Sequence, residues 1–371
     1  VFETGLKKFG SFLLKITLVL SIFILGANLF FHKPLADSIL FSLAIAVGMA
    51  PELLPAIMTL AMTAGAKRML SKKVIVKKLS AIINLGEVTV LCTDKTGTIT
   101  EGVSKVHSLV DPTGHESQMV MELAKVNSIL QSGFPNPIDE ALAKLDCDVS
   151  DYIKLGGIPY DFSRRRLTIL AQKEKNIQLI SKGAVSNILD ICTKFQMGET
   201  VHPLDETALQ KLTEQFESHS QSGLRVLGIA SKDCTLTRLE PEDEKDMTFL
   251  GFILLEDPLK EGVIDSIGRL KALNTTLKII TGDNRYVAAY TARQIGLDPS
   301  KMLVGNDMQT MVPEALRVKA METEIFAEIE PQQKEAIVRA LQKSGIAVAY
   351  MGDGINDVAA IHAADTGISV E

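Results

Sequence analysis

Three apolar runs of this chain end in acidic loops that carry the residues of phosphate chemistry. The runs and their acids are Val88–Cys92 with Asp94, Leu277–Ile280 with Asp283, and Ile346–Met351 with Asp353 and Asp357. One acidic turn is unremarkable, but carboxylates that gather at equivalent strand ends repel one another unless a cation lies among them. Hard oxygen ligands beside a phosphate group favour Mg²⁺.

Asp94 is the acid best placed to react. An aspartate is already ionised at pH 7, because its ordinary pKa is about 3.9. It can attack a phosphoryl group without a general base once a metal screens the negative charges. We therefore interpret Asp94 as a nucleophile that forms an aspartyl phosphate, against the simpler interpretation of a polar turn.

The neighbours of these acids suit the same chemistry. Glycines permit tight turns whose backbone N–H groups face phosphate oxygens, and threonine hydroxyls reach the same oxygens. Lys334, at the start of a helix after Glu330-Pro331, can reach a phosphate as a point charge, although its position alone favours a solvated helix lysine. The glycines and threonines are Gly97, Gly282, Gly352, Gly354, Thr96 and Thr281.

The elements that position these loops alternate between strands and helices. Helical patterns at Tyr286–Ile295 and Gln332–Ser344 lie between apolar strands, which predicts an α/β fold with a parallel, doubly wound sheet. In such sheets reactive groups gather at the carboxyl ends of the strands. The four aspartates are therefore expected to converge on one crevice.

Residues 105–248 interrupt this sheet and are long enough for a separate core. Lys182-Gly183-Ala184 follows one predicted strand, and Asp161–Arg166, with Phe162 inside it, precedes another. An aromatic ring, bases and a glycine can hold a purine and its phosphates, but a basic strand edge or a core phenylalanine is equally consistent. No GxxxxGK[ST] loop is present, which excludes a Walker-type nucleotide site.

Composition sets the remaining bounds. The chain has 371 residues, 46% hydrophobic and 23% charged, with a formal net charge of −6. Its length predicts two or three domains, and its charge argues against a nucleic-acid partner. The four cysteines have no metal-site spacing and suit a reducing cytosol.

Two long apolar stretches, about 12–31 and 39–62, predict a transmembrane helical hairpin, since about 20 residues span a bilayer. A buried core hairpin is the alternative. Bases precede the first stretch and follow the second, which predicts that both ends and the large remaining part are cytoplasmic. Glu52 lies between Pro51 and Pro55, so freed carbonyls and a carboxylate would form a cation site at a broken helix, against a simple proline kink.

Four motifs in order and spacing resemble those of P-type cation-transporting ATPases: DKTGT at 94–98, KGA at 182–184, TGD at 281–283 and GDGIND at 352–357. Within that family the chain is most similar to the bacterial magnesium-transporting branch, on PELLP at 51–55, the segment 74–98, IPYDFSRRR at 158–166 and the ending MGDGINDVAAIHAADTGISVE.

The resemblance implies a fold and a set of roles. The sheet would be a haloacid-dehalogenase-like, Rossmannoid phosphorylation domain, and the insert an α+β nucleotide-binding domain. The implied organisation is 1–76 for two membrane helices and stalk, 77–104 and 249–371 for the two parts of the phosphorylation domain, and 105–248 for the nucleotide-binding domain. The implied catalytic residues are Asp94, Lys95, Thr96, Thr281, Gly282, Asp283 and Lys334. The implied ATP contacts are Asp139, Phe162, Lys182, Gly183, Arg225 and Asn356. The implied ligands of Mg²⁺ are Asp94, Thr96, Asp353 and Asp357, and the implied ligand of the transported ion is Glu52.

Two departures from the family pattern, Asp257-Pro258-Leu259-Lys260 and Val358-Ala359 after Asp357, are interpreted as lying outside the chemistry. No Thr-Gly-Glu-Ser motif is present, so we expect a piece of a longer pump without its actuator domain and later membrane helices.

The expected function is ATP-driven cation transport across the plasma membrane, with magnesium import first. Calcium, sodium or proton transport, a non-transporting phosphatase of the same fold, and a non-functional truncation remain alternatives.

Overall fold

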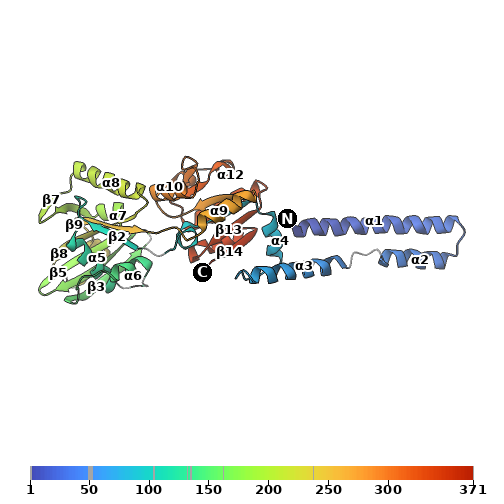
Figure 1. Ribbon diagram of the computed structural model, residues 1–371, viewed down its shortest axis with the longest axis horizontal. Coiled ribbons are helices and arrows are strands. Elements are labelled where there is room, and N and C mark those ends of the chain that lie inside the picture. Colours follow the sequence, from blue (N-terminus) through green and yellow to red (C-terminus); the bar gives the residue numbers. More distant parts are fainter. Residues whose placement is uncertain are drawn as a thin grey trace.

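The computed structural model describes residues 2–48, 53–102, 105–131, 133, 136–161, 163–236 and 238–370. Two β-sheets lie side by side, and three N-terminal helices extend away from them as a long arm (Figure 1). The chain is thus an α/β protein with two sheets of different character, one parallel and one mixed.

The smaller sheet has six strands, and every pairing in it is parallel. Its central strand β1 (Val90–Thr93) lies between β10 (Thr276–Ile280) and β13 (Val348–Gly352), so the three strands that precede the acidic loops are adjacent. The outer strands are β11 (Met302–Val304), β12 (Ile325–Ala327) and β14 (Thr366–Ser369).

Helices cover both faces of this sheet, as a parallel sheet requires. Alternate residues of β1 point to opposite cores: Cys92 packs toward α12, α13 and α14, whereas Leu91 packs toward α9 and α10. The helices are α9 (Val263–Ala272), α10 (Arg285–Gln294), α11 (Gly305–Gln309), α12 (Pro313–Glu322), α13 (Pro331–Lys343) and α14 (Val358–Ala363).

The larger sheet has eight strands and is mostly antiparallel. Its strands are β2 (Lys105–Val110), β3 (Tyr152–Asp161), β4 (Arg166–Lys173), β5 (Asn176–Ala184), β6 (Cys192–Met197), β7 (Thr200–Pro203), β8 (Arg225–Cys234) and β9 (Met247–Glu256). Helices α5 (Gln118–Leu130) and α6 (Pro137–Ala143) contribute to one apolar core, and α7 (Val185–Leu189) and α8 (Glu206–Gln221) to another.

Strand β9 crosses the domain boundary that we expected after residue 248. It pairs with β8 through Leu255 and with β2 through Glu256, so the larger sheet continues eight residues beyond that point. The expected boundary is therefore displaced, because the run Met247–Leu255 is buried as a central strand of the larger sheet.

The N-terminal arm contains α1 (Phe2–Phe30), α2 (Leu35–Gly48) and α3 (Leu53–Leu70). Among the described residues, one helical stretch, Ser11–Phe30, is long and apolar enough to cross a membrane; α2 is apolar but shorter. The second expected span, 39–62, is thus described as parts of two helices on either side of residues 49–52. Glu52 and Pro51 lie outside the described residues.

A short helix, α4 (Ser80–Glu87), joins the arm to the parallel sheet. It packs against α3 and against β14, and the Asn84 side-chain amide donates a hydrogen bond of 3.0 Å to the carbonyl of Asp365. The arm therefore connects to the edge of the sheet whose central strand carries Asp94.

Candidate active site

Asp94 directly follows β1 and lies at the centre of a carboxylate cluster. One oxygen each from Asp94, Asp353 and Asp357 can be chosen so that all three lie within 4.8 Å of one another. Asp94 and Asp357 are buried, and Asp353 is exposed at the rim. The parallel order of β1 and β13 produces this cluster, because both strands end at the same edge of the sheet.

Lys334 provides the cluster's cation. Its Nζ lies 2.9 Å from Asp94 Oδ1 and 2.7 Å from Asp357 Oδ1. Although burial opposes it, Asp94 and Asp357 hold the pKa of Lys334 above its ordinary value, so the ammonium is charged. With three carboxylates and one ammonium, the ionised cluster carries a net charge of −2.

The electrostatics of Asp94 record this surplus of negative charge. Burial raises its pKa to about 6, and the Asp357 and Asp283 carboxylates add to the rise while Lys334 opposes it. A hard divalent cation among the three carboxylates would relieve the repulsion, and oxygen ligands suit Mg²⁺. The residues present therefore fit the metal that the sequence predicts.

Gly97 permits the close approach of two loops at this site. Its φ is +73°, and a Cβ there would lie 1.7 Å from Asp353 Oδ2. Any other residue would push Asp353 away from Asp94. Gly97 is therefore required by geometry in the turn η1 (Lys95–Ile99).

Lys95 faces away from the three carboxylates. It is buried between Asp283, at 2.8 Å, and Asp257, at 3.2 Å. Although burial disfavours the charged form, Lys95 and Arg225 hold the pKa of Asp283 below its ordinary value. Lys95 thus links the loop after β1 to the loop after β10.

Sequence reasoning placed the segment of Asp257 outside the chemistry, yet Asp257 contacts Lys95 in the loop after β1. Besides Lys95, it accepts hydrogen bonds from Thr100 Oγ1 at 2.6 Å and from the Gly102 N–H at 3.0 Å. Lys260, in the same segment, donates to the Gly97 carbonyl. The segment 257–260 therefore clamps the loop that carries Asp94. An aspartate just after the apolar run 249–255 was the available signal.

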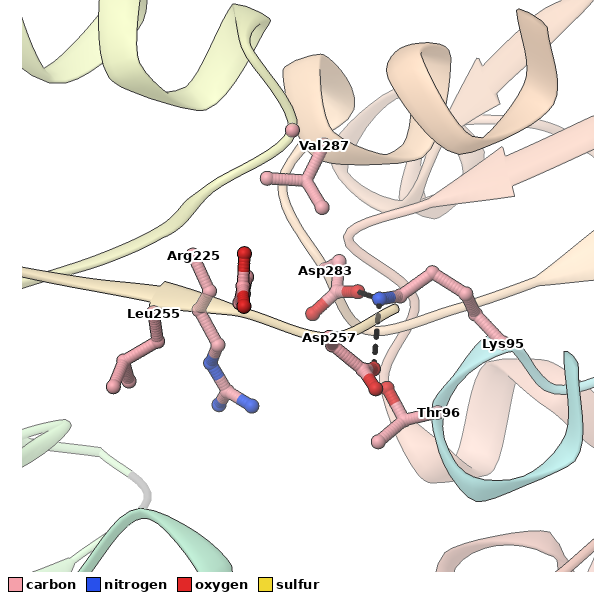
Figure 2. Close-up of a pocket in the computed structure, with 9 residues that line it drawn as sticks. Lys95, Thr96, Arg225, Leu255, Asp257, Asp283 and Val287 are labelled. Atoms are coloured by element: carbon pink, nitrogen blue, oxygen red, sulfur yellow. Dashed lines mark hydrogen bonds and ion pairs between the residues drawn. The ribbon is translucent and has the colours of Figure 1, made fainter. Parts of the chain in front are cut away.

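A cleft lies between the two sheets (Figure 2). Arg225 and Leu255 line one side, and Lys95 and Thr96 line the other. The remaining lining residues are Gly223, Glu256, Asp257, Asp283 and Val287. Of the predicted ATP contacts, the cleft contains Arg225.

Three other predicted ATP contacts lie away from the cleft. Asp139, on α6, and Lys182, on β5, are buried and form an ion pair of 2.5 Å, and Lys182 Nζ also donates to Ser128 Oγ at 2.6 Å. Gly183 lies against the Arg165 carbonyl, where a Cβ would be 2.4 Å from that oxygen. Phe162 lies outside the described residues.

Three further predicted residues, Thr281, Gly282 and Asn356, belong to the loops of the parallel sheet. Thr281 is buried, and its Oγ1 accepts the Asp283 N–H at 3.1 Å, which fixes the turn containing Gly282. Asn356 is exposed after β13, one residue before Asp357.

The arginine run before β4 is held by an acid that sequence reasoning missed. Glu244 is buried; it accepts hydrogen bonds from Arg164 at 2.8 and 2.9 Å, from Arg166 Nε at 2.7 Å and from Thr168 Oγ1 at 2.5 Å. Two of the three arginines in the run therefore serve the fold. Glu244 lies in a polar stretch, PEDEKD, that looks like a solvated loop.

The chain is an α/β protein with an acidic, lysine-containing cluster at the carboxyl edge of its parallel sheet, and comparison with known proteins identifies the family. The profile described as "P-type ATPase, cytoplasmic domain N" matches residues 119–262. Magnesium-transporting ATPases, P-type 1, of Salmonella typhimurium and Escherichia coli are 36% identical over the whole chain. A calcium-transporting ATPase of Listeria monocytogenes is 30% identical over 90% of it.

The chain belongs to the P-type ATPase family. It spans 42% of the length of the magnesium-transporting relatives and 41% of the calcium-transporting one.

Proposed function

We propose that this chain carries the phosphorylation and nucleotide-binding parts of an ATP-driven cation pump that works through an aspartyl phosphate on Asp94. The observation that supports the proposal most strongly is the cluster itself, in which the proposed nucleophile Asp94 lies at a strand end beside two further carboxylates and within 2.9 Å of the Lys334 ammonium. In this proposal the parallel sheet is a haloacid-dehalogenase-like, Rossmannoid phosphorylation domain, the larger sheet binds ATP, and the N-terminal helices belong to the membrane part.

The proposed reaction has two steps. An Asp94 carboxylate oxygen attacks the γ-phosphorus of ATP, the bond from that phosphorus to the β,γ-bridging oxygen breaks, and ADP leaves. Water then attacks the phosphorus, the bond to Asp94 breaks, and inorganic phosphate leaves with Asp94 restored. In both steps the Lys334 ammonium stabilises the negative charge at the reacting Asp94 and phosphoryl group, because it already contacts Asp94.

Mg²⁺ would be held by Asp94, Asp353, Asp357 and the Thr96 segment, where it would screen the charge of the phosphoryl oxygens. The Thr281, Gly282 and Asn356 loops would surround the transferred group. ATP would approach from the larger sheet, with Arg225 in the cleft, and with Asp139, Phe162, Lys182 and Gly183 assigned to the nucleotide on the family resemblance alone.

The proposed cargo is Mg²⁺, because the magnesium-transporting relatives are more similar to this chain than the calcium-transporting ones are. Glu52, between two prolines, is the proposed ligand of the transported ion, and the proposed location is the plasma membrane with both sheets in the cytoplasm. An actuator domain and further membrane helices are the proposed partners. Uptake of Mg²⁺, but not of Ca²⁺, Na⁺ or protons, by membrane vesicles that contain the full-length pump would support this cargo.

The test is covalent labelling with [γ-³²P]ATP in the wild-type chain and in Asp94→Asn. The amide keeps the shape of the side chain but removes its nucleophilic charge, so labelling should fall below detection. Asp146→Asn, an exposed aspartate in the larger sheet's connections, is the matched control and should label normally. Persistent labelling of the Asp94→Asn variant, or hydrolysis of simple phosphate esters without any ATP-derived label, would contradict the pump mechanism.

A further inference from the structure

Tyr350 is a buried polar residue inside the cluster that no motif pointed to. It lies on β13, next to β1, and its side chain is fully buried in the core that α13 covers. Its hydroxyl donates a hydrogen bond of 2.8 Å to Asp357 Oδ1. Burial and the Asp357 carboxylate raise the pKa of Tyr350, so the hydroxyl keeps its proton and acts as the donor.

The Asp357 oxygen that receives this hydrogen bond also receives Lys334. Lys334 Nζ lies 2.7 Å from the same Oδ1, so two donors from two different elements occupy its two lone pairs. The other oxygen, Oδ2, packs against the backbone of Gly352, where a Cβ would lie 2.4 Å from it. The Asp357 carboxylate is thus fixed from both sides.

The two donors differ in what else they hold. Lys334 also contacts Asp94, at 2.9 Å, whereas Asp357 is the only hydrogen-bond partner of the Tyr350 hydroxyl among the described residues. Transfer of a phosphoryl group to Asp94 replaces one carboxylate charge with a more highly charged group beside Lys334. A lysine ammonium on a flexible stem can turn toward that charge, and a tyrosine on a central strand cannot follow it.

We propose that Tyr350 is a positioning residue that keeps Asp357 hydrogen-bonded when Lys334 turns toward a phosphoryl group on Asp94. This inference rests on the proposed function. A buried carboxylate that lost its one cation and had no second donor would be strongly destabilised, and it would draw Lys334 back or rotate. Because the Tyr350 hydroxyl stays hydrogen-bonded to Asp357, Lys334 can turn from Asp357 toward the phosphoryl group while Asp357 keeps its position.

Tyr350→Phe tests the proposal because it deletes only the hydroxyl. The probe is Mg²⁺ with beryllium fluoride, which mimics a phosphorylated aspartate, and the readout is the Mg²⁺ concentration at half of the maximal thermal shift of the full chain. The expected result is an increase of about 10-fold, in line with the loss of a hydrogen bond to a charged group. In single-turnover labelling, the rate of phosphorylation should fall while the KM for ATP is unchanged.

Tyr152→Phe is the matched control. Its hydroxyl also donates to a carboxylate, Glu122, at 3.0 Å, but in the larger sheet and away from the cluster. This variant should leave the half-saturating Mg²⁺ concentration unchanged. A Tyr350→Met variant repeats the deletion with a flexible side chain, in case the phenylalanine variant does not fold.

The outcomes separate this inference from the proposed function. If the wild-type chain shows no Mg²⁺–beryllium fluoride shift, the proposed function fails. If the wild-type chain responds and the Tyr350 variants respond at the same Mg²⁺ concentration, the positioning role is overturned. A lower melting temperature without Mg²⁺, at an unchanged half-saturating concentration, would also overturn it, because it would show a role in stability alone.

Discussion

The two sheets bury their charges in opposite ways. In the larger sheet each buried charge is matched within the chain: Glu244 by Arg164 and Arg166, and Lys182 by Asp139. In the parallel sheet, the buried Asp94 and Asp357 both contact one cation, Lys334, and the exposed Asp353 lies beside them.

A buried charge is tolerated when it is paired and hydrogen-bonded, and it is costly otherwise. The buried charges of the larger sheet are therefore balanced among the described residues, whereas the cluster of the parallel sheet carries a surplus of negative charge. The difference indicates where a cation would bind: a divalent ion would offset the surplus of negative charge in the cluster.

The largest expected effect tests the balanced side of this comparison. Glu244→Gln keeps the shape of the side chain but leaves two arginines without their carboxylate, which should lower the free energy of unfolding by about 3–5 kcal/mol. Urea denaturation measures this change in the free energy of unfolding, and a separate hydrogen-exchange experiment on the native protein measures the protection of β4 and β5. Glu242→Gln, at an exposed neighbouring position, is the control and should change stability by less than about 0.5 kcal/mol.

Mg²⁺ should not rescue the Glu244→Gln variant, because the lost partner belongs to the larger sheet. A loss below about 1 kcal/mol would mean that the arginines find other partners. The ion pairs of Glu244 would then contribute little to the stability of the larger sheet, and the contrast with the parallel sheet would be weakened.

The second effect tests the acidic cluster of the parallel sheet through the pH dependence of the free energy of unfolding. Burial raises the pKa of Asp94 to about 6 in the folded chain, above its unfolded value near 3.9. The proton is therefore bound more tightly by the folded state. This tighter proton binding contributes fully to the free energy of unfolding below about pH 4. The contribution is lost as the pH rises through about 6, and the total loss is about 3 kcal/mol.

Asp94→Asn removes this dependence. Without Mg²⁺, the variant should be more stable than the wild-type chain at pH 7.5, and the difference should close toward pH 4. Urea denaturation of both chains across this range gives the difference directly, and saturating Mg²⁺ should shrink it at pH 7.5. An identical difference at every pH would show that Asp94 does not carry the stored repulsion.

Much of this arrangement was predictable from local patterns. Asp94, Asp283 and Asp353 follow apolar runs that the structure shows as β1, β10 and β13, and parallel pairing brings such strand ends together. The helix that begins after Glu330 with Lys334 in its first turn was also evident from Pro331 and the period that follows.

The residues that balance or fix the charges were not predictable in the same way. Glu244 and its arginines are separated by about 80 positions, and Asp257 and Lys95 by 162, so no local period connects them. In the sequence Tyr350 looks like an ordinary core aromatic in an apolar run. Its hydroxyl finds its partner, Asp357, only when the chain folds and α13 packs over β13. The end of the larger sheet at Glu256 was missed for the same reason: β9 belongs to whichever sheet its partners form.

The smallest effect compares two buried threonines, one on each side. Thr168, in the larger sheet, donates to Glu244 at 2.5 Å, whereas Thr98, in the loop after β1, has a buried Oγ1 without a hydrogen-bond partner among the described residues. Thr168→Val should cost about 1–2 kcal/mol, because it removes a hydrogen bond to a charged group. Thr98→Val should be neutral or stabilise by up to about 1 kcal/mol, because it removes an unsatisfied hydroxyl of nearly the same shape.

Both variants are measured by urea denaturation without Mg²⁺, so that the internal balance alone decides the result. The order of the two effects matters more than their size. If Thr98→Val cost as much as Thr168→Val, the Thr98 hydroxyl would have to be as well satisfied in solution as that of Thr168. The contrast between the two sheets would then rest on their charged groups alone.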